Sequence, residues 1–94
     1  MKVLDKVESR ERCAEAGWFA YDFLLDQEID PEFIRGLKPL GSWVFLSMLA
    51  KPFFKVESEH FMIKGLLGEK HFRVAVHHEY EEEVSRIERL IEQI

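Results

Sequence analysis

The chain has 94 residues, a mass of 11.2 kDa and 47% hydrophobic residues, which suffices for one small core and leaves no room for a second. We therefore expect residues 1–94 to form a single domain. A formal net charge of −5 argues against a general nucleic-acid-binding protein, since such domains carry a basic excess. The single cysteine, Cys13, cannot form an intramolecular disulfide, which favours a cytoplasmic location. No apolar run approaches the roughly 18 residues that cross a bilayer, so we expect no membrane association.

The N-terminal segment carries a helical pattern over residues 6–26. Asp5 and Glu8 have the spacing of a capping box, and charged and apolar side chains separate onto opposite faces at 100° per residue. Phe19 falls within the charged face and Phe23 at its edge. Exposed aromatic pairs often mark protein contacts, so Phe19 and Phe23 are a candidate interface with a second copy or a protein partner. The alternative, that another segment folds over both rings, is equally compatible with the sequence.

Two short segments follow. The residues DPEF at 30–33 predict the start of a short helix, because Asp is a favoured N-cap and Pro suits the first helical turn. Gly36 or Pro39 ends it. Residues 43–50, WVFLSMLA, are ambiguous: Leu, Met and Ala favour a buried helix, whereas Trp, Val and Phe favour a strand. We favour the helix.

The second half of the chain changes to strand periodicity and then returns to helix. Residues 53–57, 60–67 and 71–77 alternate between apolar and polar side chains, as strands packed on one face do. Residues 79–94 have a helical apolar stripe. The predicted fold is therefore α+β. It consists of a three-stranded, or four-stranded, antiparallel meander with N-terminal and C-terminal helices packed on one face.

The register of the meander follows from its turns. Gly68 suits the first central position of a type II′ turn, which places Lys64 opposite Arg73. A tight turn at 58–59 would place residues 53–57 beside residues 60–64. The outward face then has three rows of side chains, which are Phe53, Lys64 and Arg73; Lys55, Met62 and Ala75; and Glu57, His60 and His77.

Three cations on this outward face form a candidate anion site: Lys55, Lys64 and Arg73. Lys64 and Arg73 are like charges on neighbouring strands, which is unfavourable unless a phosphate, a carboxylate or an acidic partner surface lies over them. The acidic residues 79–83 of a second copy could supply that surface. The simpler interpretation, which we favour, is that the long side chains extend into solvent.

The row of Glu57, His60 and His77 matches in residue type the two-histidine, one-carboxylate set that binds divalent metals. Neighbouring strands lie roughly 4.8 Å apart, so three such side chains could converge on one ion. We favour the alternative of a polar row on a hydrated sheet face.

Motifs that usually accompany catalysis are missing from the sequence. It has no Gly-rich phosphate loop, no CxxC, no HExxH and no GxSxG. We therefore expect a small cytoplasmic interaction or regulatory domain without catalytic activity or cofactor, which self-associates or binds a protein partner. The alternative function is an anion-binding or metal-binding module on the outward sheet face, with nucleic acid a disfavoured ligand.

Overall fold

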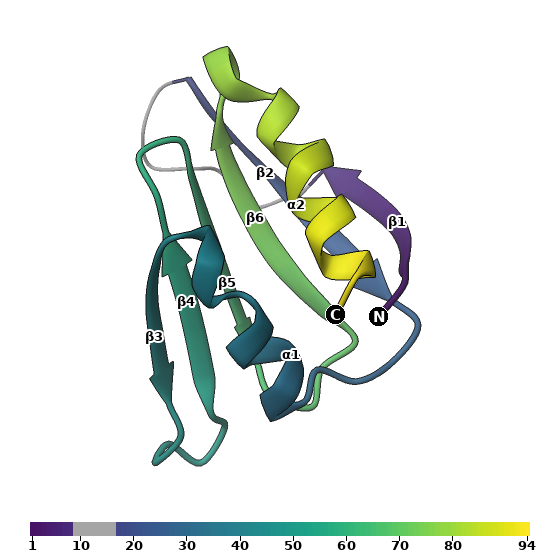
Figure 1. Cartoon of the computed structure of the whole chain (residues 1–94), viewed down its shortest axis with the longest axis vertical. Helices are drawn as coiled ribbons and strands as arrows, with labels where there is room; N and C mark the ends of the chain where they lie inside the picture. The colour runs from purple at the N-terminus through teal and green to yellow at the C-terminus, as the bar shows by residue number, and fades with distance from the viewer. Residues whose placement is uncertain (9–16) are drawn as a thin grey trace.

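The computed structural model describes residues 1–8 and 17–94, and its largest feature is one antiparallel sheet of six strands (Figure 1). In space the strands follow the order β1-β2-β6-β5-β4-β3. Their bounds are β1 (Val3–Glu8), β2 (Trp18–Leu25), β3 (Ser42–Leu46), β4 (Phe53–Glu57), β5 (Phe61–Leu66) and β6 (His71–His77). The helices are α1 (Pro31–Gly36), α2 (Glu82–Glu92) and two short 3-10 turns, η1 (Lys38–Leu40) and η2 (His78–Tyr80).

The predicted N-terminal helix over residues 6–26 is wrong, because the described part of this segment forms β1 and β2. Residues 9–16, with Cys13, lie outside the described residues. Strand β2 has the sequence WFAYDFLL, in which four of eight residues are aromatic and favour a strand. It lies between β1 and β6, and both of its faces contain apolar side chains. A strand with apolar residues on both faces lacks clean alternation, which allowed a helical pattern to fit it.

The segment 43–50 also departs from the predicted helix. Residues Ser42–Leu46 form β3, which pairs with β4 so that Trp43 faces Val56 and Phe45 faces Phe54. The Trp43 indole donates a hydrogen bond from Nε1 to the backbone oxygen of Ile34 at 2.7 Å. The aromatic residues thus decide the conformation, since a strand lets both rings pack on one face of the sheet. The predicted three- or four-stranded meander with terminal helices is therefore corrected to a six-stranded sheet with two short helices.

The meander β4-β5-β6 agrees with the sequence pattern, and the predicted pairing of β5 with β6 is confirmed. Lys64 lies opposite Arg73, and Phe61 lies opposite Val76. Gly68 has the positive φ of 87° that the turn requires. The turn itself is one residue earlier than predicted, because the Glu69 N–H donates to the Leu66 oxygen at 3.4 Å. The strand register is unaffected by this difference.

Helix α1 begins as its sequence predicts. The Asp30 carboxylate accepts a hydrogen bond from the Phe33 N–H at 2.8 Å, and a proline occupies the first helical turn. Helix α2 places Ile87 and Ile91 in the core, as the apolar stripe of the C-terminal segment predicts.

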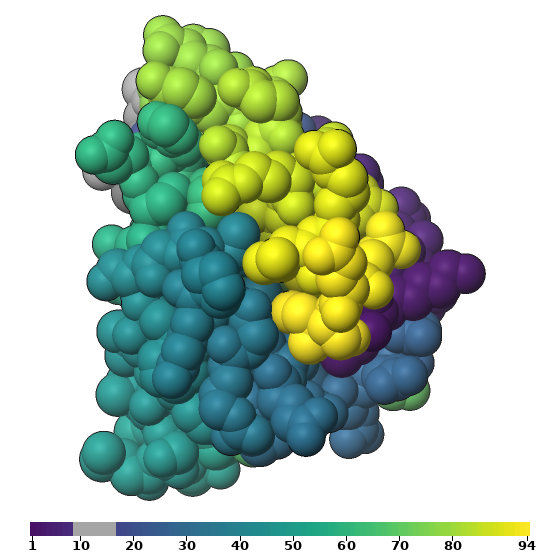
Figure 2. Space-filling view, viewed as in Figure 1, coloured from purple at the N-terminus to yellow at the C-terminus, as the bar shows by residue number. Residues whose placement is uncertain are grey.

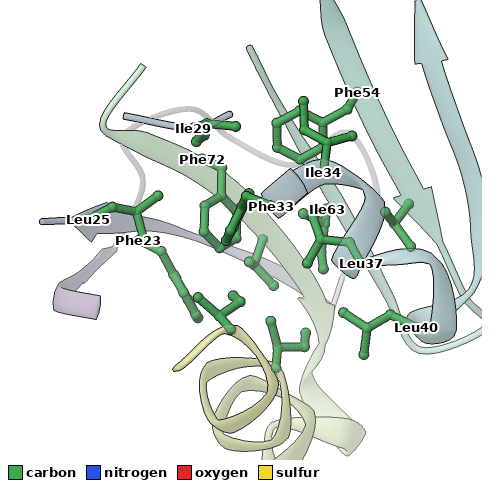
Figure 3. Packing of buried hydrophobic residues seen from close by; sticks show 14 of the residues in the cluster. Phe23, Leu25, Ile29, Phe33, Ile34, Leu37, Leu40, Phe54, Ile63 and Phe72 are labelled. Carbon is green, nitrogen blue, oxygen red and sulfur yellow. The ribbon is translucent and has the colours of Figure 1, made fainter. Parts of the chain in front are cut away.

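Both helices lie on the same face of the sheet, where the buried side chains form one cluster (Figures 1 and 3). Phe72 of the central strand β6 is at its middle, with ring centroids 5.2 Å from Phe23 and 5.8 Å from Phe33. The C-terminal residue Ile94 lies against Gly36 of α1, so the ends of the two helices meet, as the space-filling view shows (Figure 2). In the described residues no helix lies on the opposite face.

Candidate functional site

The candidate site is the face of the sheet opposite the two helices, which we call the open face, together with its outer strand β3. Cross-strand pairing puts the side chains of this face into rows. One row is charged over most of its length and consists of Asp22, Arg73, Lys64, Lys55 and Val44. The neighbouring row is mainly apolar and consists of Leu24, His71, Leu66, Phe53 and Leu46. The open face therefore joins cationic and apolar strips side by side.

The structure brings the three predicted anion-site residues into one row on adjacent strands. Lys55 lies opposite Lys64, and Lys64 lies opposite Arg73. The two outer cations have acidic neighbours: Lys55 forms an ion pair with Glu57, and the Arg73 Nε lies 3.4 Å from the Asp22 carboxylate. Lys64, in the centre, is exposed and forms no ion pair within residues 1–8 and 17–94. Lys64 is thus the cation of this row best placed for an external negative charge.

A shallow cavity of about 360 Å³ opens beside Lys64 on the same face. Its lining combines charged side chains with apolar ones: Asp22, Lys64, Glu69, His71 and Arg73 with Phe53, Leu66, Phe72 and Gly65. That volume lies at the lower end of the range of small-molecule sites. Because the lining carries both signs of charge, the cavity does not select a ligand class by itself.

The predicted row of Glu57, His60 and His77 is corrected by the register of β4 and β5. Glu57 faces Met62, because the connection is two residues longer than the predicted tight turn, with the Ser58 N–H bonded to the Phe61 oxygen at 2.9 Å. The predicted alternation of side chains between the two faces of the sheet was correct. Strand β4 therefore shifts by two residues relative to β5, and its side chains stay on the predicted faces. Within residues 1–8 and 17–94, no three His, Cys, Asp or Glu side chains are grouped to hold a metal ion.

The two histidines of that row instead surround Tyr80 at the end of the sheet. The His60 ring stacks on Tyr80 with a centroid distance of 3.7 Å, and its Nδ1 lies 3.8 Å from the Glu83 carboxylate. His77 packs edge-on against Trp18 at 5.7 Å and accepts the Glu79 N–H at Nδ1. These contacts give both rings a structural role, which is to join the end of β6 to the start of the C-terminal helical segment.

The predicted interface residues Phe19 and Phe23 lie on the same face of β2, opposite Val76 and Phe72, but they differ in exposure. Phe23 is fully buried in the core, so it belongs to the alternative in which other segments cover the ring. Phe19 is 41% exposed on β2 opposite Val76. The two rings therefore do not form a joint exposed patch.

A stronger apolar surface lies on β3 and the turn after it, where the sequence predicts a buried helix. The described residues include nine large hydrophobic side chains with high exposure, and four of these lie between residues 44 and 49. They are Val44, Leu46, Met48 and Leu49. We call this set the apolar hairpin; its turn extends beyond the helices at the lower end of the molecule in Figure 1. A signal in the sequence was available, because residues 39–50 contain no charged side chain in a chain that is 33% charged.

Comparisons with protein-family models, with curated proteins and with solved structures found no match to this chain. Within residues 1–8 and 17–94, no helix combines the length and apolar character that crossing a membrane requires.

Proposed function

We propose that this protein is a small non-catalytic interaction domain that associates with a second copy of itself, and that the apolar hairpin is part of the contact surface. The observation that carries the proposal is the concentration of exposed apolar side chains at Val44, Leu46, Met48 and Leu49. Large apolar groups that are contiguous and exposed mark interaction sites, whereas isolated ones are ordinary. Met48, with 86% of its surface exposed, contributes almost nothing to the core of a single copy.

Sedimentation equilibrium over a wide range of protein concentration tests this proposal. Self-association predicts an average mass that rises from one chain towards two as the concentration increases. A mass that remains that of one chain at the highest attainable concentration would overturn the proposal.

Added sodium chloride distinguishes two modes of association. Contact through apolar side chains survives or strengthens with salt. Contact between the cationic row and the acidic residues 79–83 of a second copy weakens, because exposed charges are screened within a Debye length of about 8 Å at physiological ionic strength. We expect the first behaviour.

A second candidate function, anion binding at Lys64, is favoured by one specific observation. Lys64 lies between Lys55 and Arg73 and forms no ion pair among the described residues. Titration with inorganic pyrophosphate, followed by NMR, would shift the amide signals of Lys64 and its two row neighbours. The variant Lys64→Gln would abolish those shifts. Equal shifts in both proteins, or shifts spread over the whole surface, would exclude a site at this row.

A further inference from the structure

The two outer strands of the sheet, β1 and β3, differ in their protection against pairing with another chain. An outer strand exposes unpaired backbone groups, and charged side chains or bulges normally block additional pairing. Strand β1 has three charged residues among six, Asp5, Lys6 and Glu8, and its pairing with β2 is interrupted between Val3 and Asp5. These are the usual means of blocking an edge. The edge formed by β1 is therefore protected.

Strand β3 carries neither form of protection. Its sequence SWVFL contains no charge and no proline, and all five of its residues pair with β4 without an interruption. No described element pairs with its outer side, and β3 forms the left margin of the sheet in Figure 1. Such an edge readily accepts a further strand.

The sequence of β3 also fits a second copy of itself. In an antiparallel pair centred on Val44, the whole strand overlaps, and Val44 lies opposite the partner's Val44. Trp43 then lies opposite the partner's Phe45 on the helix-covered face, where each ring is half-buried in a single copy. Facing aromatic side chains stabilise an antiparallel pair. Since residues 39–50 carry no charge, two such segments meet without bringing like charges into the strand pair.

We propose that β3 pairs antiparallel with β3 of a second copy, so that two six-stranded sheets join across a two-fold axis into one continuous sheet. This inference rests on the proposed self-association and specifies its interface. A two-fold pairing uses the same strand in both copies and closes the assembly at a dimer. If β3 paired instead with β1 of another copy, each assembly would keep a free β1 and a free β3, so copies would add indefinitely. The charged side chains of β1 and its interrupted pairing with β2 oppose this alternative.

The variant Val44→Lys tests this interface, with Val7→Lys as a control on the other outer strand, where the cross-strand neighbour is Asp22 rather than Lys55. Both valines lie on outer strands of the sheet and have similar exposure, 41% for Val44 and 44% for Val7. Lysine at position 44 would place two ammonium groups opposite each other at the two-fold axis, so we expect the dimer dissociation constant to rise about tenfold or more. Val7→Lys should leave that constant unchanged, and far-UV circular dichroism establishes that both variants are folded.

The outcomes separate this inference from the function on which it rests. A wild-type protein that dimerises, with Val44→Lys dimerising equally well, would overturn β3 pairing and leave self-association intact. Equal weakening by both lysine variants would also overturn β3 pairing, because it would indicate a general effect of charge. A wild-type protein that remains monomeric would overturn both proposals.

A second measurement needs no variant and therefore does not depend on how Val44→Lys folds. In the wild-type protein, the outward amides of β3 should exchange with deuterium more slowly as the protein concentration rises, since pairing protects them. Amides of β1 should show no such dependence. Exchange at β3 that is independent of concentration, in samples where sedimentation shows a dimer, would overturn the inference.

Discussion

Gly41 fixes the start of β3 against the end of β4, and replacing it by alanine gives a sharp test of this packing. A Cβ atom at position 41 would lie 2.2 Å from the backbone oxygen of Glu57. That separation is about 1 Å shorter than carbon and oxygen atoms normally allow. Backbone atoms of a paired strand cannot rotate away as a side chain can, so Gly41→Ala must separate β3 from β4 locally.

Overpacking of this kind costs about 1–3 kcal/mol, and we expect Gly41→Ala to lower the free energy of unfolding by about 2 kcal/mol. For a domain of this size the melting temperature would fall by about 10 °C. Urea unfolding followed by tryptophan fluorescence measures the first quantity, and calorimetry measures the second.

Gly36→Ala is the matched control for Gly41→Ala. Its Cβ would lie 2.8 Å from Cδ1, 3.0 Å from Cγ1 and 3.2 Å from Cγ2 of Ile94, a partly exposed side chain rather than the backbone of a paired strand. The side chain can move, and alanine favours the helix by up to about 1 kcal/mol, so the net change should be small. A Gly41→Ala protein as stable as the Gly36→Ala protein would refute the assignment of close β3–β4 contact at Gly41.

Three further substitutions test the rest of the fold. Asp30→Ala removes the carboxylate that caps α1 through the Phe33 N–H and should cost about 1 kcal/mol in urea unfolding, whereas an unchanged midpoint would exclude the cap. Phe72→Ala removes the ring at the middle of the core and should cost about 3–5 kcal/mol; a loss below about 1 kcal/mol would contradict its central position. Lys6→Met breaks the partly exposed ion pair with Glu88 and should cost at most about 1 kcal/mol, with the difference disappearing at high salt; a larger or salt-independent loss would contradict a surface ion pair.

Local signals in the sequence were sufficient for the meander β4-β5-β6 and for the start of α1. Strands with one buried face alternate strictly, which fixed the faces of β4, β5 and β6 and the register across the β5–β6 turn. The Asp30 cap depends only on residues within one helical turn, so the sequence revealed it directly. Alternation also placed Lys55, Lys64 and Arg73 on one face, but it put Lys55 in the row of Met62; their common row required the true length of the β4–β5 connection.

The rest of the fold depended on contacts between distant segments. The sequence of β2 fits a helical pattern because this interior strand has apolar side chains on both faces, and its conformation as a strand depends on pairing with β1 and β6. The residues Leu, Met and Ala within 43–50 favour a helix, whereas Ser42–Leu46 form the strand β3. Its exposure at Val44 and Leu46 becomes visible only when β3 is placed at the edge of the sheet, which local patterns do not specify. The candidate interface was missed for the same reason.

The most direct measurement of β3–β3 pairing is isotope-filtered NMR on a mixture of labelled and unlabelled wild-type protein, which detects only contacts between different copies. Pairing of β3 with itself predicts nuclear Overhauser effects between the Trp43 ring of one copy and the Phe45 ring of the other. Contacts confined to β1 or to the cationic row around Lys64, in a protein that sedimentation shows to be dimeric, would contradict the pairing of β3 with β3 of a second copy.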